Sequence, residues 1–498
     1  MEKTMKSAIK NTARGLGLAL ALIATAGLAR AAGFAIYEND ARGFAMGNAN
    51  VGSNDDASAL YSNPAAITQL PGAQVKVGIT LIQPSIDVST ANQYANGGVA
   101  NGALKNATFS MNNYTQVIPN LYATYRLNDE MSVGLGIYTP FGLKSDFQSD
   151  PHSWGGAFNN YYTSIATTQI TPTFAYRIVH DQPWAKSLSV AIGIGFLNSK
   201  IDIRKQLDFT YQGAAQAIGA QLVAGGMPPD AAESFIESPA GQSQIVGMLN
   251  DPAILGQIQA GLTAKGLPAY APLTMNGGGW DANYNLSLQW EINDQVSVGV
   301  VYRSVTRNAY HAATANVGNI CSGNAAADIT LPASWNFGVN YKPIVPLNIG
   351  LNLTYTQWSS WNALDITTYG MNNGDPLGLN KPDAVPPQIK DWKNVWRYSI
   401  GGEYQLNNQI ALRAGFVIDK DPVNQQWADF MVPSNDRLIY SIGLGWTINK
   451  NVSLDFAYGY LHIKGMDFAA RPAEGIYTNS SVKAGHANIA SVSGNFRF

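Results

Sequence analysis

The sequence predicts an all-β protein, a transmembrane antiparallel β-barrel of 14 strands with an N-terminal hatch in its lumen. Charged residues make up only 13% of the chain and hydrophobic residues 46%. No stretch after the N-terminal leader reaches the roughly 18 consecutive apolar residues of a spanning helix. Strands of alternating hydrophobicity recur from residue 73 to the end, and short polar turns alternate with long connections between them. These observations together favour a barrel in the bacterial outer membrane.

Residues 1–31 are expected to be a signal peptide. Four cations within the first 14 residues precede an apolar run, and Ala29-Arg30-Ala31 supplies the small-x-small pattern that signal peptidase cleaves. The apolar run is about 14 residues long, which disfavours the alternative of a transmembrane anchor. Cleavage after Ala31 would remove five cations and one acidic residue and leave a net charge of about −6. This charge argues against a nucleic-acid partner.

Residues 32–72 are expected to form the hatch. They are rich in Gly, Ala, Asn and Ser and have too few large apolar side chains to build a core of their own. A larger structure must therefore enclose them. Because the predicted strands begin directly after this segment, we expect residues 73–498 to form a barrel that closes around it.

The strands are predicted from apolar residues at every second position, since successive side chains of a strand point to opposite faces. In residues 347–355, Leu, Ile, Leu, Leu and Tyr alternate with Asn, Gly, Asn and Thr, so that one face suits lipid. Fourteen such segments are expected, and an even number suits single-chain bacterial barrels. They are residues 73–90, 114–127, 131–143, 160–180, 187–207, 276–292, 295–310, 328–343, 346–361, 391–406, 409–420, 434–448, 451–465 and 485–498.

The connections between these segments sort by length. Tight polar turns such as Leu127-Asn128-Asp129-Glu130 are typical of hairpins. We expect all of them on the periplasmic side and all the long connections outside. The long connections are residues 91–113, 144–159, 208–275, 311–327, 362–390, 421–433 and 466–484.

The longest connection, residues 208–275, is expected to be helical and extracellular. Three short helices are predicted between residues 212 and 266, two of them opened by Pro228-Pro229-Asp230 and Asp251-Pro252. They are amphipathic and weakly charged. A lid over the barrel mouth and an apolar landing groove for a ligand are both open interpretations.

Motifs of catalysis and metal binding are not found in the sequence. Cys321 is the single cysteine, so neither an intrachain disulfide nor a thiol metal site is possible. The five histidines lack metal spacing, and neither a Gly-x-Ser-x-Gly motif nor a phosphate loop occurs. We therefore predict neither an enzyme nor a bound metal or cofactor.

Several cations are expected to face the lumen, because a cation facing lipid near the midplane would cost about 2–4 kcal/mol. In the segment from Asp391, the apolar positions Trp392 and Trp396 are taken as outward, which leaves Lys393 and Arg397 inward. The same test places four further arginines inside. Such cations can hold the carboxylate of a ligand, or they can tie the hatch to the wall through its aspartates. The further arginines are Arg303, Arg307, Arg413 and Arg437, and the aspartates are Asp40, Asp55 and Asp56.

Nine short motifs resemble one known family in order: Ala32-Gly33-Phe34, Asp55-Asp56-Ala57, Ser62-Asn63-Pro64-Ala65, Pro140-Phe141-Gly142-Leu143, Tyr302-Arg303-Ser304, Leu331-Pro332-Ala333-Ser334-Trp335, Thr356-Gln357-Trp358-Ser359, Trp396-Arg397-Tyr398-Ser399-Ile400-Gly401 and Val432-Pro433-Ser434-Asn435-Asp436-Arg437. With them the chain resembles the FadL-type outer-membrane transporters, which carry long-chain fatty acids and, in relatives, aromatic hydrocarbons such as toluene. Asn63-Pro64-Ala65 is the corresponding hatch motif.

The resemblance implies a buried ligand pocket that touches the mature N-terminus. Phe34 and Phe44 of the hatch are the expected ligand-binding residues there, beside the inward cations Arg303, Lys393, Arg397 and Arg437. It also implies sideways exit through a gap made by an inward kink in the third strand. Pro140 lacks an amide hydrogen and Gly142 tolerates unusual dihedrals, so both are candidates for this gate. Alternatively, Pro140 merely ends a strand near the outer rim.

The resemblance thus implies passive uptake of hydrophobic molecules, without an energy-coupling protein. A general polar porin and an adhesin or structural barrel are the alternatives. A porin needs an open, charge-lined constriction, whereas this chain devotes about forty residues to a plug. The expected partners are a hydrophobic small molecule, outer-membrane lipid and the barrel-assembly machinery, which recognises a terminal residue such as Phe498; the chain is expected to be a monomer.

Overall fold

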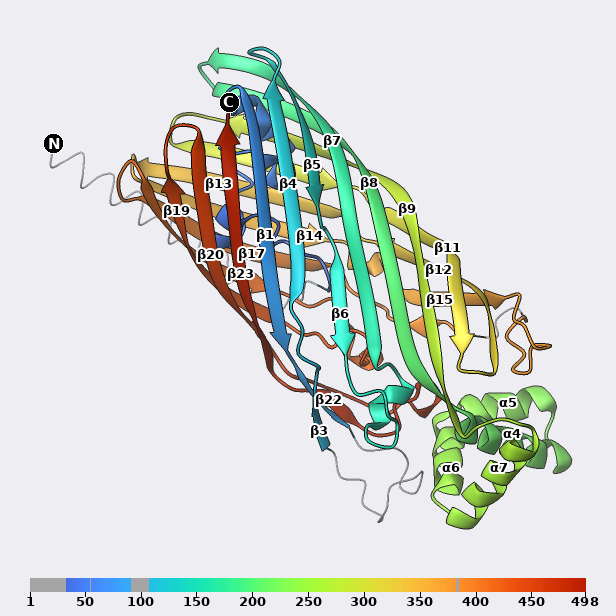
Figure 1. Ribbon diagram of the computed structural model, residues 1–498. Helices are drawn as coiled ribbons and strands as arrows, with labels where there is room; N and C mark the ends of the chain where they lie inside the picture. Colours follow the sequence, from blue (N-terminus) through green and yellow to red (C-terminus); the bar gives the residue numbers. More distant parts are fainter. Residues whose placement is uncertain (1–32, 54, 91–106, 382–384) are drawn as a thin grey trace.

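A closed antiparallel barrel of fourteen strands surrounds the N-terminal segment (Figure 1). The computed structural model describes residues 33–53, 55–90, 107–381 and 385–498. The expected signal peptide and cleavage site therefore lie outside the described residues. β1 pairs with β4 on one side and with the last strand, β23, on the other, which closes the barrel. The prediction of a fourteen-stranded barrel is confirmed.

Four of the fourteen strands consist of two pieces, and four short strands and β16 complete the mouth. The barrel strands are β1 (Ala73–Ser85), β4 (Gln116–Arg126), β5 (Met131–Tyr138) with β6 (Gly142–Asp146), β7 (Tyr162–Gln182), β8 (Ala185–Asp208), β9 (Tyr270–Glu291), β10 (Val296–Arg303) with β11 (Thr306–Val317), β12 (Cys321–Leu331) with β13 (Ser334–Ile344), β14 (Leu347–Thr356) with β15 (Ala363–Tyr369), β17 (Val395–Gln405), β18 (Ile410–Asp419), β19 (Arg437–Thr447), β20 (Val452–Ile463) and β23 (Gly485–Arg497). The small strands are β2 (Asp87–Thr90), β3 (Ala107–Ser110), β16 (Gln388–Ile389), β21 (Met466–Phe468) and β22 (Ser480–Val482).

The outer face of the barrel is apolar, as the alternation predicts. Tyr440 and Ile442 of β19 are 52% and 61% exposed, whereas Ser441 between them is buried. An exposed apolar row of this kind is unfavourable in water but matches the hydrocarbon core of a bilayer. The alternating rows therefore identify the surface that faces lipid.

The prediction that residues 311–327 form a long connection is wrong. β11 runs to Val317 and β12 begins at Cys321, and the two strands pair down to a short turn in which Gly318 has a left-handed φ of +48°. Residues 362–390 likewise begin as strand β15. These extensions are rich in Ala, Asn, Thr and Gly. They lack a row of large apolar residues, so alternation does not reveal them.

The connection between β8 and β9 forms a helical unit at the end of the barrel that carries the long loops, here the loop end (Figure 1). It comprises α4 (Phe209–Ala224), α5 (Pro229–Glu237), α6 (Pro239–Leu249) and α7 (Pro252–Ala264). The sequence predicts three helices, and α6 is the additional one, capped by the Ser238 hydroxyl. No helix of the described residues is long and apolar enough to cross a membrane.

The hatch fills the lumen with short elements: α2 (Ala41–Ala45), α3 (Ala59–Ser62) and the 3₁₀ helix η1 (Pro64–Gln69) (Figure 1). Its backbone lies directly on the inner wall where the wall residue is glycine. A Cβ atom at Gly350 or Gly401 would overlap the carbonyl oxygens of Ala49 or Met46. Close approach of two backbones is one reason for glycine within a strand.

We expect Gly401→Val to displace the hatch from this wall and to lower the free energy of unfolding by about 1–3 kcal/mol, the usual range for overpacking. Thermal unfolding of the detergent-solubilised protein measures the change. Gly402→Val is the matched control, because its Cβ would meet its nearest neighbour at an ordinary 3.7 Å. Equal unfolding temperatures for the two variants would show that the hatch does not depend on the glycine contact.

Candidate functional site

An apolar cavity of about 160 Å³ lies between the start of the hatch and the barrel wall. This volume matches that of dry, apolar cavities of about 150 Å³ that bind benzene. Hatch residues 33–38 form one side. The other side is formed mainly by aliphatic residues of the wall and of the loop before β19, including Ile82, Leu143, Val432, Ile439, Leu461, Ile463 and Ile489.

The wall of the cavity arises because inward-facing side chains change character along the strands. On β20, the inward residues Asp455, Ala457 and Gly459 are followed toward the loop end by Leu461 and Ile463. β1 and β23 show the same change from polar to apolar. These lining residues were not predicted as site residues. The signal in the sequence is an apolar stretch on the face that is otherwise small or polar.

Phe34 closes one end of the cavity inside an aromatic cluster. Its ring centroid lies 4.8 Å from that of Trp358, 5.1 Å from Trp361 and 5.9 Å from Trp392. Gly33 before it has a left-handed φ of +45°, and a Cβ there would collide with two of these indoles. The cluster therefore holds the start of the hatch in one position.

The third strand of the wall is broken next to the cavity. β5 ends at Tyr138 and β6 resumes at Gly142, so Pro140 does not mark the end of the strand at the rim. β4 pairs with β5 only from Leu121 onward, and among the described strands β6 pairs with β7 alone. Residues 116–120 of β4 thus lack a partner on this side within the described part of the sheet. A gap in the ladder results between β4 and β6.

The hatch fills the inner side of this break. The Ile36 amide donates to the carbonyl oxygen of Pro140 at 2.9 Å, and the Gly142 amide donates to the carbonyl oxygen of Phe34 at 3.0 Å. Ala35 and Phe141 form the corresponding antiparallel bridge. The residues that line the cavity are therefore also the residues that cover the gap.

The predicted cations occupy different places. Arg437 lines the apolar cavity, donates to the Gly33 carbonyl oxygen at 3.2 Å and lies 3.4 Å from Asp419. Arg303 and Arg397 contact the hatch instead, through the Tyr61 carbonyl oxygen and over the ring of Tyr37. Of the predicted ligand-binding cations, the structure places only Arg437 at the apolar cavity.

The outward assignment of Trp392 is wrong, and with it the alternation that placed Lys393 inward. β17 begins at Val395, so the alternation cannot be extended back to Lys393, which is exposed, or to Trp392, which is buried in the aromatic cluster. Arg307 is also exposed.

Phe44 and the hatch motif lie away from the apolar cavity. The Phe44 ring packs against Gly459 of the wall. The side-chain amide of Asn63 donates to the carbonyl oxygens of Val51 and Leu288, and its oxygen accepts from the Ala65 amide. Pro64 starts η1. These residues shape and seat the hatch.

Comparison with known proteins bears on what this arrangement does. Residues 21–498 match the family described as "Outer membrane protein transport protein (OMPP1/FadL/TodX)". The chain belongs to this family.

Relatives within the FadL/TodX family match along nearly their whole length. A putative outer membrane protein of Neisseria meningitidis serogroup B is 25% identical over 515 residues, covering 99% of each chain. The long-chain fatty acid transport protein of Escherichia coli K12 is 25% identical over 469 residues, covering 91% of this chain and 92% of that protein. The chain is thus an outer-membrane protein of a family of transporters for fatty acids and aromatic hydrocarbons.

Solved structures share the fold. The crystal structure of a Pseudomonas aeruginosa FadL homologue superimposes with a TM-score of 0.72 at 18% identity, covering 94% of this chain and all of that one. The Pseudomonas putida toluene transporter TodX gives a TM-score of 0.61 at 14% identity, covering 92% and 98%. The resemblance inferred from the motifs is confirmed.

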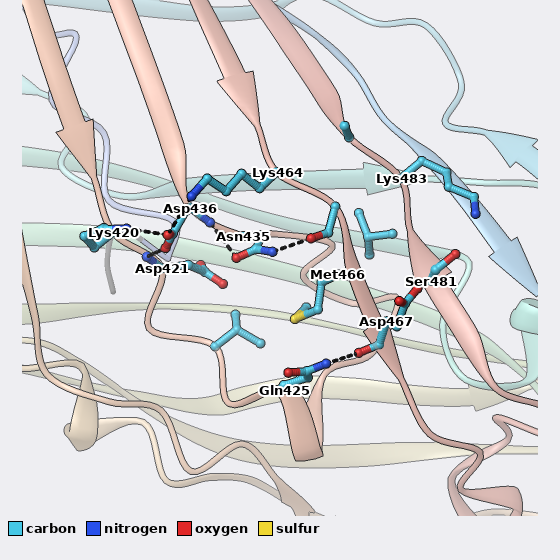
Figure 2. A pocket seen from close by; sticks show the side chains of 14 residues that line it. Lys420, Asp421, Gln425, Asn435, Asp436, Lys464, Met466, Asp467, Ser481 and Lys483 are labelled. Atoms are coloured by element: carbon cyan, nitrogen blue, oxygen red, sulfur yellow. Dashed lines mark hydrogen bonds and ion pairs between the residues drawn. The ribbon is translucent and has the colours of Figure 1, made fainter. Parts of the chain in front are cut away.

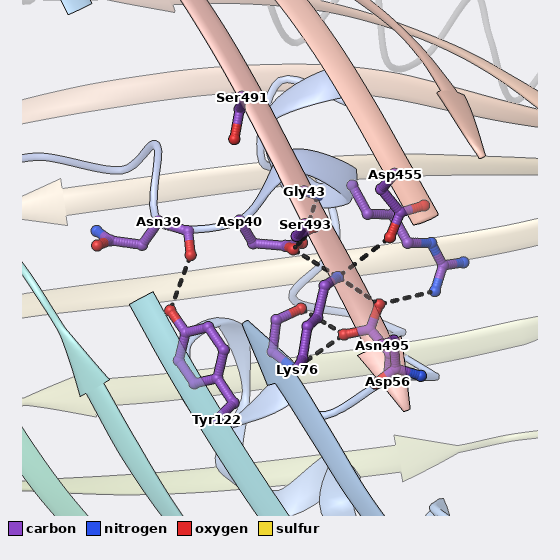
Figure 3. A network of polar contacts seen from close by, with 12 residues as sticks. Asn39, Asp40, Gly43, Asp56, Lys76, Tyr122, Asp455, Ser491, Ser493 and Asn495 are labelled. Atoms are coloured by element: carbon purple, nitrogen blue, oxygen red, sulfur yellow. Dashed lines mark hydrogen bonds and ion pairs between the residues drawn. The ribbon is translucent and has the colours of Figure 1, made fainter. Parts of the chain in front are cut away.

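In this FadL/TodX-family barrel a buried charge network fixes the hatch (Figure 3). The fully buried amine of Lys76 lies 2.5 Å from Asp40, 2.8 Å from Asp56 and 3.4 Å from Asp455. Asp40 and Asp56 belong to the hatch, while Lys76 and Asp455 belong to the wall. The hatch aspartates are therefore tied to the wall, as one of the two interpretations of the lumen charges proposed, through a lysine that the sequence did not single out.

A second, larger cavity of about 540 Å³ lies among the loops that follow β18, β20 and β22 (Figure 2). Its lining is mostly polar and charged and includes the ion pair of Lys420 with Asp436. Burial raises the pKa of Asp421 to about 7, and the nearby Arg437 opposes this shift. Such a surface does not suit an apolar ligand. Among the described residues no group of His, Cys, Asp and Glu is placed to hold a metal ion.

Proposed function

We propose that this protein carries hydrophobic molecules, long-chain fatty acids or aromatic hydrocarbons, across the outer membrane by diffusion and without catalysis. The ligand enters from the loop end, occupies the apolar cavity at the start of the hatch and leaves sideways between β4 and β6. The protein acts as a monomer, and the loop end faces the outside of the cell.

The double role of residues 34–36 carries this proposal. They line the apolar cavity, and they are hydrogen-bonded to the broken third strand at Pro140 and Gly142. Two hydrogen bonds, each worth about 1 kcal/mol net, join this segment to the strand, and the aromatic cluster around Phe34, which borders the cavity, supplies the rest of its attachment. Displacement of this segment therefore joins the cavity to the gap in the wall and to lipid.

A polar porin fits the structure less well. The lumen below the cavity is filled by the hatch, whose side chains pair with the wall through buried ions. A sugar would have to displace this network, whereas an apolar ligand would have to displace only residues 34–36 of the hatch. We expect slow sugar influx in a liposome swelling assay and saturable binding of oleate or toluene.

A disulfide between the hatch and the third strand tests the route. Ala35 and Phe141 form a bridge flanked by the two hydrogen bonds above, which is the non-hydrogen-bonded pair of an antiparallel ladder. Such Cα atoms lie about 4.5 Å apart, within the range that a disulfide spans. In a Cys321→Ser background, we expect oxidised Ala35→Cys/Phe141→Cys to lose at least about 90% of hydrocarbon or fatty-acid uptake, because a covalent bond holds the segment over the gap.

Reduction of the same double variant supplies the control. Uptake should return with a reductant, and the two single-cysteine variants should not respond to oxidation. Full uptake by the cross-linked barrel would refute sideways exit past the third strand.

A further inference from the structure

A small polar cavity lies beneath the start of the hatch. Its volume is about 30 Å³, enough for one or two water molecules and too small for an alkyl chain. Hatch residues, including Tyr37 and Asn48, form one side. The opposite wall contributes two arginines, two asparagines and a threonine, namely Arg303, Arg397, Asn336, Asn352 and Thr354.

Among the described residues, the lining presents four buried donor atoms and one buried acceptor, Oδ1 of Asn352, that have no hydrogen-bond partner. Arg397 is only 2% exposed, and its Nη2 lacks a hydrogen-bond acceptor in the described part of the chain. The amide nitrogens of Asn336, which is 5% exposed, and Asn48 are in the same situation. Buried donors without acceptors are unfavourable, and several around one cavity point to a ligand that accepts hydrogen bonds.

The charges of the lining also favour a ligand that accepts hydrogen bonds. Guanidinium groups stay charged in proteins, so Arg303 and Arg397 bring two positive charges. The Asp419 carboxylate lies 3.7 Å from Arg397, yet it also pairs with Arg437 at 3.4 Å. The buried Glu38 carboxylate also interacts with Arg397 and Arg437 but does not line this cavity, so Arg303, Arg397 and Arg437 together face two carboxylates, Asp419 and Glu38.

The two other charged side chains at the cavity differ, because Asp40 is compensated by a cation and Arg303 is not compensated by a carboxylate in the described part of the chain. Arg303 lies over the ring of Tyr61, and no carboxylate within ion-pair distance of it is found in the described residues. Asp40 also lines the cavity, but it is held by Lys76 at 2.5 Å and by the Gly43 amide at 2.7 Å. The remaining potential favours an anion.

We propose that this cavity binds a small anion, the size of a halide ion or of a single carboxylate group. Arg397 and Asn336 donate from the wall, and Asn48 donates from the hatch. The anion thereby ties the hatch to strands β13 and β17. The source is either a free halide or the head group of a fatty acid, since Tyr37 lines both this cavity and the apolar one. The head-group case rests on the proposed function.

Anomalous scattering from crystals soaked in sodium bromide tests the site directly, with the full mature chain and no substitution. We expect a bromide peak between Arg397 and Asn336 that is absent from Arg397→Gln. A second variant, Asn336→Leu, removes one donor without removing charge and should lower the occupancy. A cavity that scatters only as water, with bromide bound solely at surface lysines, would overturn the proposal.

Competition then identifies the source. If the head group of the ligand uses the cavity, bromide weakens the binding of oleate but not of oleyl alcohol, and Arg397→Gln weakens oleate alone by roughly ten- to a hundredfold. A bromide peak without competition assigns the site to free halide. If neither the bromide peak nor the competition is observed, the anion site is refuted. Hydrocarbon uptake, and hence the proposed function, would be unaffected by that result. Conversely, failure of the disulfide test leaves the bromide result standing.

Discussion

Replacement of Lys76 by Met is expected to release the hatch and convert the barrel into a leaky pore. Lys76 is fully buried and is the shared partner of Asp40, Asp56 and Asp455. Methionine keeps the apolar stem but leaves the carboxylates without this cation. Breaking a buried ion pair from one side typically costs about 3–5 kcal/mol. The network joins the hatch to the wall, so the hatch should detach before the strands separate.

Two measurements test the effect of Lys76→Met. Sugar influx in a liposome swelling assay should rise well above the wild-type rate. The barrel itself should keep its resistance to thermal unfolding. Lys186→Met is the matched control: its amine also lies 2.5 Å from a carboxylate, Asp294, but the two side chains are 52% and 84% exposed. Exposed pairs contribute about 0–1 kcal/mol, so the control should not leak. Wild-type sugar influx in Lys76→Met would show that the network does not hold the hatch.

The strands were predictable because lipid imposes a regular pattern on them. Wherever the outer face meets hydrocarbon, as along β19, large apolar residues recur at every second position. Where strands extend past this zone, as β11 and β12 do toward Gly318, polar and small residues suffice and the pattern is lost. The number of strands therefore follows from the sequence, while their length beyond the apolar zone does not.

The site was predictable only in part. The break at Pro140 follows from a residue that cannot donate to the ladder. By contrast, Trp358, Trp361 and Trp392 come from short connections outside the regular strands, and no periodic rule places them around Phe34. Which carboxylates a lumen cation pairs with depends on how the hatch is seated, which the local sequence does not determine.

Phe34 and Phe44 lie at different places in the hatch, so substitution of each one distinguishes ligand binding from attachment of the hatch to the wall. They are almost equally buried, at 3% and 1% exposed. Phe34 lines the apolar cavity, whereas Phe44 packs against Gly459 below it. Truncation of a buried Phe to Ala typically costs about 3–5 kcal/mol. Phe34→Ala therefore destabilises the segment that closes the cavity. Phe44→Ala destabilises the contact between the hatch and the wall at Gly459.

We therefore expect Phe34→Ala to weaken the binding of oleate or toluene by at least about tenfold, since only about 1.4 kcal/mol of the loss needs to reach the binding equilibrium. Phe44→Ala should bind within a small factor of wild type while unfolding at a lower temperature. Isothermal titration and thermal unfolding of both detergent-solubilised variants measure the two effects. If Phe44→Ala lost affinity as strongly as Phe34→Ala, the ligand would have to lie deeper in the lumen than the apolar cavity, and the position of the cavity next to the gap in the wall would no longer explain how cargo leaves.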